Sequence, residues 1–191
     1  MSRFLSSALG RLFILSLVLY VLTTILGYEA SRAPGGDEAT KRAIQSLAQV
    51  LGPMGGLDPP QMMAVIFLNN AVKALAVIAL GFSLGIVPFI FLALNGVITG
   101  VVVSAVASKV GPGMAIAFIA PHGVIEIPAI LLASALGFRV AEAVIWRIAG
   151  RQTYPGRELK SGLVIYAKVV LPALLVAAGV EAFITPLLIG R

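Results

Sequence analysis

Long apolar stretches alternate with short polar ones along the whole chain. Five of them are long enough to cross a hydrocarbon core of about 30 Å, which takes roughly 20 helical residues. We expect these spans at residues 7–28, 62–82, 85–107, 112–137 and 161–188. The pattern therefore predicts an all-α fold, a polytopic membrane helix bundle of five transmembrane helices in a single integral membrane domain, residues 1–191.

The polar stretches between the spans carry helical patterns of their own. Residues 29–61 form the predicted outer loop, where DEATKRAIQSLAQVLGP places apolar residues on one helical face and predicts an amphipathic helix at the membrane surface. Asp58, with Pro59 next and Gln61 three positions on, has the pattern of a capping box that starts the second span. The basic segment 138–160 is also amphipathic in part, which predicts an interfacial helix on the cytoplasmic side.

Composition excludes a soluble fold. The chain is 59% hydrophobic and 12% charged with a mean hydropathy of +1.03, so it has too few polar residues to cover a water-exposed surface. The absence of cysteine removes disulfides, thiolate metal sites and thiol nucleophiles. The net charge is +6, but no basic cluster is interleaved with stacking aromatics, so we expect a lipid bilayer and no nucleic acid as partner.

Basic residues predict how the bundle is oriented, because Lys and Arg collect on the cytoplasmic side of membrane proteins. With five spans, most of those outside the spans or near their ends fall on one side: Arg3, Arg11, Arg139, Arg147, Arg151, Arg157 and Lys160. We therefore expect a multi-pass protein of the cell membrane with a cytoplasmic N-terminus and an outer C-terminus.

Most strongly polar residues inside the spans fall in pairs four positions apart, so each span after the first presents one polar stripe. The pairs are Asn69 with Lys73, Asn95 with Thr99, His122 with Glu126, and Glu181 with Thr185. A charge in the middle of a bilayer costs from about 2.5 to more than ~10 kcal/mol, so such groups face the bundle interior. We predict one buried polar cluster: His122, Glu126, Glu181, Lys73, Asn69, Asn70, Asn95 and Thr185.

The backbone of the fourth span is predicted to be irregular. Pro121 and Pro128 have no amide hydrogen to donate to the preceding turn, and Gly123 loosens the helix between them. We expect a break or kink here. If a second half-helix starts at Pro121, free amides at residues 122–124 would offer a seat for a carboxylate.

The residues leave several interpretations of the cluster open. It could serve only to fix the packing of the helices. A divalent metal on His122, Glu126 and Glu181 is a second interpretation, and a metal-dependent intramembrane hydrolase would follow from it. Transport of an ion or small solute is a third, for which a homodimer would be expected to complete the pathway, since five spans are few for a transporter protomer.

Four motifs from the second to the fifth span, FLNN, ALNG, PHGVIEIPA and VEAFITP, resemble the stage II sporulation protein M family. The matching positions are Asn70, Asn95, Gly96, His122, Gly123, Glu126, Pro128, Glu181, Thr185 and Pro186. The resemblance implies a multi-pass membrane protein whose founding member holds peptidoglycan-degrading partners at the membrane during bacterial sporulation. Family members also occur where no spore is made, so it implies a scaffold or assembly subunit with other envelope proteins as partners, and not sporulation itself.

Overall fold

The computed structural model describes residues 7–36, 38, 40, 41, 45 and 56–185, with the backbone alone at 116–119, 121 and 122. Five of its helices are long and apolar enough to cross a membrane: Ala8–Arg32, Pro59–Ser83, Ile86–Val110, Gly123–Ile148 and Pro155–Ile184. The predicted helical membrane bundle is confirmed. The amphipathic helix expected in the outer loop falls mostly outside the described residues.

The first three spans begin at sequence signals for helix starts. Helix α2 (Ala8–Arg32) follows Ser7, whose side chain accepts a hydrogen bond from the Gly10 amide at 3.1 Å. Helix α4 (Pro59–Ala79) begins with the predicted capping box, in which the Gln61 amide donates to Asp58 at 2.9 Å and the Asp58 amide to Gln61 at 3.2 Å. A short 3-10 segment, η2 (Leu80–Ser83), and a left-handed Gly85 then turn the chain into α5 (Ile86–Val110).

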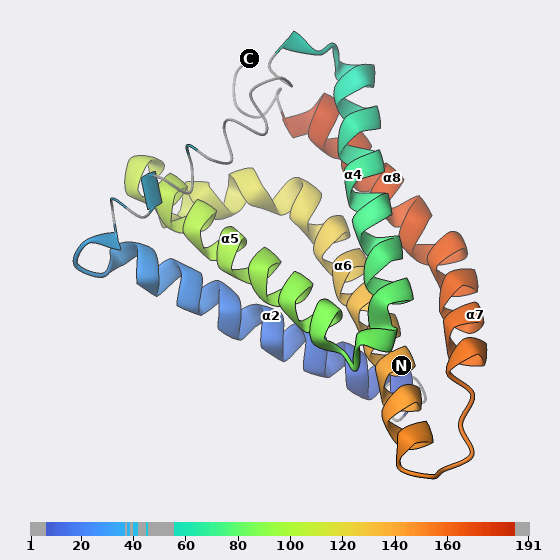
Figure 1. Ribbon diagram of the computed structural model, residues 1–191. Coiled ribbons are helices and arrows are strands. Elements are labelled where there is room, and N and C mark those ends of the chain that lie inside the picture. The colour runs from blue at the N-terminus through green and yellow to red at the C-terminus, as the bar shows by residue number, and fades with distance from the viewer. Residues whose placement is uncertain (1–6, 37, 39, 42–44, 46–55, 186–191) are drawn as a thin grey trace.

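The fourth span belongs to one unbroken helix, α6 (Pro112–Ile148), of 37 residues. Figure 1 shows it changing direction along its yellow, N-terminal part, so the helix is kinked and not broken. A second half-helix starting at Pro121 is therefore wrong, because the amides of residues 122–124 lie inside a continuous helix. Neighbouring groups can satisfy the carbonyls that a proline leaves unpaired without ending the helix.

The C-terminal end of α6 extends well beyond the expected limit at residue 137. Residues 138–148 continue the helix, and Val140, Ala141 and Ala143 are buried along it. Arg139 forms an ion pair with Glu158 on α7 (Pro155–Ile165). Only residues 149–154 connect the two helices.

The fifth span alternates between α-helical and π-helical turns. After α7 come η3 (Tyr166–Val170), α8 (Leu171–Gly179) and η4 (Val180–Ile184), of which η3 and η4 are π-helical. Pro172 has no amide hydrogen, so the carbonyl of Lys168 lacks its α-helical partner beside the first of these segments. Each of the two π-helical segments contains one charged residue, Lys168 in η3 and Glu181 in η4.

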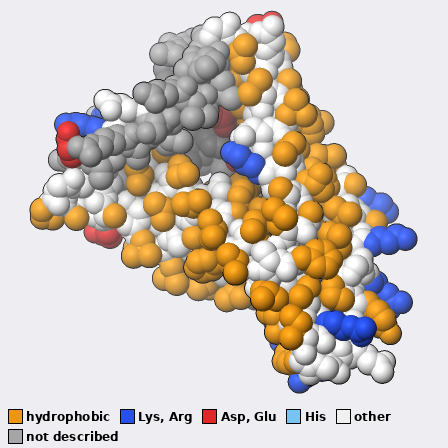
Figure 2. Space-filling view, in the orientation of Figure 1, with side chains coloured by type: hydrophobic (Ala, Val, Ile, Leu, Met, Phe, Trp, Pro, Cys, Tyr) orange, Lys and Arg blue, Asp and Glu red, His pale blue; other side chains and the backbone are white. Residues whose placement is uncertain are grey.

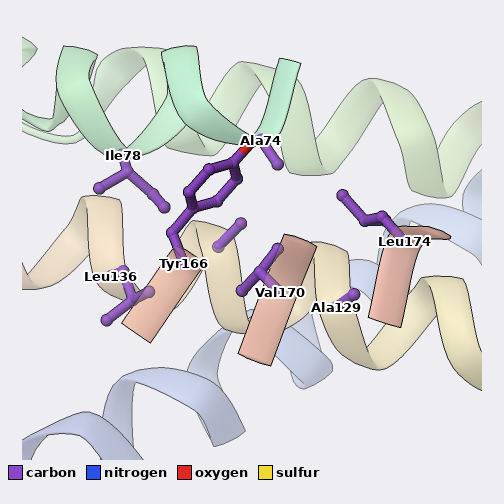
Figure 3. Packing of buried hydrophobic residues seen from close by; sticks show 8 residues of the cluster. Ala74, Ile78, Ala129, Leu136, Tyr166, Val170 and Leu174 are labelled. Atoms are coloured by element: carbon purple, nitrogen blue, oxygen red, sulfur yellow. The ribbon is translucent and has the colours of Figure 1, made fainter. Parts of the chain in front are cut away.

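Helix α6 lies between two arms of the bundle (Figure 1). One arm is the pair α2 and α5, which pack along their length; the other is α4 with α7, η3 and α8. In the second arm a core cluster of Ala74, Ile78, Ala129, Ala133, Leu136, Tyr166, Val170 and Leu174 joins α4, α6 and the fifth span (Figure 3). The arms diverge from the turn at Gly85, and α4 and α5 make few contacts with each other.

The surface of the bundle suits lipid. Apolar side chains cover much of the face seen in Figure 2, and Lys and Arg gather over α7 and the adjoining end of α6. Arg147, Arg151, Arg157 and Lys160 are exposed at this end. The guanidinium of Arg151 lies 3.7 Å from the centre of the Trp146 ring, an arrangement suited to the headgroup level.

Candidate functional site: a polar network between the spans

The structure brings Asn70 and Glu126 together from two different spans. The Asn70 side chain on α4 donates a hydrogen bond from Nδ2 to Oε1 of Glu126 on α6, at 3.1 Å. Both side chains are half-buried in the bundle. A hydrogen bond to a carboxyl group stabilises more than one between neutral groups, and the acceptor would be costly to leave unpaired at this depth.

The first span contributes to the same region through Tyr20, which is buried on α2. Its hydroxyl lies 2.8 Å from Oγ1 of Thr99 on α5, and it is close enough to Glu126 for the two groups to interact electrostatically. Polar side chains of α4, α6, α2 and α5 therefore lie in one region as two bonded pairs, and we call these four residues the polar network: Asn70, Glu126, Tyr20 and Thr99.

The fifth span is tied to the α4 side of the network by a different tyrosine. Tyr166 in η3 donates its hydroxyl to the backbone carbonyl of Ala71 at 3.0 Å, and the bond is buried. Figure 3 shows the Tyr166 ring reaching toward α4 between Ile78 and Ala74. Since Ala71 follows Asn70, the same turn of α4 is bonded to both α6 and the fifth span.

Asn69 and Lys73 lie on a different face of α4 from Asn70. Both side chains are exposed, and the Asn69 amide reaches only its neighbour Asn70, at 3.4 Å. Lys73 lines a groove between α4 and α5 whose other walls are apolar. Within the described part of the chain, Lys73 has no ion-pair partner.

The remaining predicted residues divide into two groups. Asn95 is bonded within α5: its side-chain amide donates to the Phe91 carbonyl at 2.7 Å, and its backbone carbonyl accepts from the Thr99 hydroxyl at 2.9 Å, so it borders the network through Thr99. Glu181 is half-buried in η4 and engaged by another group, and Thr185 donates to the Val180 carbonyl at 3.4 Å. The side chains of His122 and Pro121 lie outside the described residues.

The arrangement can hold helices together, and the Glu126 carboxyl can accept a hydrogen bond from a polar group, as it does from Asn70. Among the described residues, no three His, Asp or Glu side chains come together as candidate metal ligands. A ligand set of His122, Glu126 and Glu181 includes a side chain outside that search, so it stays a prediction.

Two of the network residues, Tyr20 and Thr99, and the interhelical donor Tyr166 were absent from the cluster predicted above. Spacing along one helix did not identify the tyrosines: Tyr166 has no polar neighbour four positions away, and Tyr20 has only the weakly polar Ser16 and Thr24. A usable signal was present, however. A tyrosine in the middle of an apolar span brings a hydroxyl that needs a partner once buried.

Comparisons with known proteins agree with this architecture. A family model described as Stage II sporulation protein M matches residues 13–186, which include most of α2, all of α4, α5 and α6, and the fifth span. An uncharacterized protein of Methanocaldococcus jannaschii is 30% identical over 128 residues, or 63% of this chain and 69% of the relative. No solved structure shows a significant match. The chain belongs to the stage II sporulation protein M family.

Proposed function

We propose that this protein is a membrane scaffold or assembly subunit that holds other envelope proteins at the cell membrane. The observation that carries the proposal is how the polar groups are used. Asn70 with Glu126, Tyr20 with Thr99 and Tyr166 with Ala71 each join two different spans. Bonds of this kind fix the relative positions of helices, which a scaffold needs in order to present a constant surface.

The divergence of the two arms supports the same proposal. Helices α4 and α5 diverge from the turn at Gly85 and make few contacts with each other. Their facing sides are therefore available for contact with another helix. A large share of the surface along the spans is apolar, and helices of partner proteins can pack there in place of lipid. A homodimer is part of the proposal, as is a cytoplasmic N-terminus.

The test compares three consequences in the purified full chain. In liposomes we expect no flux of protons, sodium or potassium above that of protein-free vesicles under any imposed gradient. In detergent we expect Glu126→Gln to lower the unfolding midpoint, and elemental analysis to find no stoichiometric metal. Flux that Glu126→Gln abolishes without changing the midpoint would overturn the proposal in favour of transport. Bound metal lost in His122→Ala would overturn it in favour of a metal-dependent enzyme.

Assembly and orientation are measured separately. Native mass spectrometry from membranes of the source organism is expected to show the chain as a dimer within a larger complex of envelope proteins, and a solitary monomer would contradict the scaffold. Because the chain has no cysteine, single-cysteine variants report orientation without background. A cysteine at Gln152, which is exposed, is expected to react with a membrane-impermeant reagent only from the cytoplasmic side.

A further inference from the structure

The groove between α4 and α5 combines a cation with apolar walls in the middle of a span. It is lined by Lys73, Ala76 and Val77 of α4 and by Val87, Ile90 and Phe91 of α5. Lys73 is roughly 21 Å along the helix from Pro59 and roughly 15 Å from Ser83, at 1.5 Å per residue. The Lys73 side chain is therefore attached to α4 in the central part of the hydrocarbon region, where an unpaired charge is costly.

The chain's own carboxylates are used elsewhere or lie at the wrong depth. Glu126 accepts the Asn70 amide, and Glu181 is engaged by another group. Glu142 faces Trp146 two turns from the end of α6, well away from the bilayer centre. A second copy of the chain would bring the same carboxylates at the same depths, so it is a poor source of a counter-charge for Lys73.

Resting on the scaffold role, we propose that this groove is the docking site for a transmembrane helix of a different protein that carries Asp or Glu near its middle. The carboxylate pairs with the ammonium group of Lys73. Asn69, exposed one turn away on the same face, is placed to donate a second hydrogen bond to the incoming helix. The walls on either side, such as Ala76 and Ile90, contact the apolar residues that flank the acidic one.

The size and setting of the groove favour a helix over other occupants. Its volume of about 250 Å³ is below the 300–1,000 Å³ typical of small-molecule sites, and it fits one or two side chains of a neighbouring helix. Lipid phosphate groups lie at the headgroup level, far from the middle of α4, where Lys73 is attached. A larger groove of about 570 Å³ beside α6 and α8, lined by residues such as Phe13, Val124 and Ala173, has no charge and can be filled by acyl chains.

The test uses designed peptides as probes in liposomes containing the full chain. Two apolar helical peptides of about 21 residues differ only at the central position, which is Asp in one and Leu in the other. Binding is measured by energy transfer from a donor on Gln152→Cys to an acceptor on the peptide. We expect the Asp peptide to bind wild-type protein about tenfold more tightly, which corresponds to ~1.4 kcal/mol.

Variants assign that preference to the groove. Lys73→Met is expected to bring the ratio of the two affinities to about one, and Lys73→Glu to transfer the preference to a peptide with Lys at its centre. Lys168→Met is the matched control, because Lys168 is an exposed lysine inside the fifth span and away from the groove, and it should leave the preference unchanged. Equal binding of the Asp and Leu peptides by wild-type protein, or a preference that survives Lys73→Met, would overturn the proposal.

Other occupants of the groove would give different results. If a second copy fills it, Lys73→Met abolishes the dimer and the partner named here is wrong. If an envelope complex purified with the chain is unchanged in Lys73→Met, the groove proposal fails while the scaffold role stands. If no complex exists, the scaffold role fails first.

Discussion

Helix α5 faces two neighbours in opposite ways. Against α2 it packs so closely that Gly96 and Gly100 have no room for a side chain, since a Cβ at either position would overlap Thr23 Oγ1 or the Thr24 carbonyl. Against α4 it leaves a groove in which Lys73 is exposed. Within a bilayer, lipid is as apolar as the helices, so association depends on close packing and polar bonds. The α2 side of α5 has both close packing and a polar bond, whereas among the described residues the α4 side has neither.

We call the α2 side of α5 closed, because its packing and bonding are complete within the bundle, and the α4 side open, because it leaves a groove. The α2 side combines glycine packing with the Tyr20–Thr99 bond, and it needs no further protein to satisfy it. The α4 side places a charged group where nothing in the described chain pairs with it. Substitutions on the closed side should therefore destabilise the fold, whereas substitution of Lys73 should affect partner binding alone.

The largest effect is expected from Gly100→Ala. The new methyl group meets the backbone carbonyl of Thr24, which cannot rotate away, so α2 and α5 must separate along their length. We expect a loss of about 3 kcal/mol in the free energy of unfolding, at the upper end of the range for overpacking. The measurement is unfolding by SDS in mixed micelles.

Gly113→Ala is the matched control for this substitution. Gly113 lies in the first turn of α6, and a Cβ there meets nothing within 4 Å. Stability should be unchanged or slightly higher, because alanine favours the helix. Equal losses in the two variants would mean that the α2–α5 contact is not close.

A smaller loss is expected from Glu126→Leu. The substitution leaves the Asn70 amide without its acceptor inside the bundle, which costs about 2 kcal/mol. Glu126→Gln keeps a carbonyl oxygen at the same place and should lose less. The same unfolding measurement applies, and a double-mutant cycle with Asn70→Leu isolates the pair. A coupling energy near zero would show that the bond adds nothing to the fold.

The sequence predicted the spans and the Asp58 capping box because these depend on local composition and on residues three positions apart. The site was harder to predict, because the spacing of residues indicates which of them share a helix face but not whether that face points into the bundle or toward lipid. Adjacent residues on a helix differ by about 100° in direction. Asn70 therefore reaches Glu126 while Asn69 and Lys73, which looked like the inward stripe, are exposed.

Pairs between distant spans could not be read from the sequence at all. Tyr20 meets Thr99 and Tyr166 meets Ala71 across 79 and 95 positions, and only the packing of the helices decides these partners. The length of α6 was underestimated for a similar reason. Residues 138–160 were expected to form a separate basic segment, but residues 138–148 continue α6, and Arg139 within them pairs with Glu158 on α7.

Tyr166→Phe tests the link between α4 and the fifth span with a moderate expected effect. Removing the hydroxyl takes away the bond to the Ala71 carbonyl while the ring keeps its place in the core cluster. We expect a loss of about 1 kcal/mol in the free energy of unfolding. Tyr154→Phe, at an exposed tyrosine near the start of α7, is the control and should have no effect. If both variants behave alike, the buried hydroxyl is not stabilising.

The smallest effect on stability is expected from Lys73→Met, and this result decides whether the two sides of α5 differ as described. The methionine keeps the length of the side chain and removes the charge. Because Lys73 is exposed and has no ion-pair partner in the described chain, the free energy of unfolding should change by no more than about 0.5 kcal/mol. SDS unfolding of this variant beside Glu126→Leu gives the comparison directly. A loss as large as that of Glu126→Leu would mean that a carboxylate within the chain holds Lys73, so the α4 side would be closed like the α2 side and no acidic partner helix would be needed.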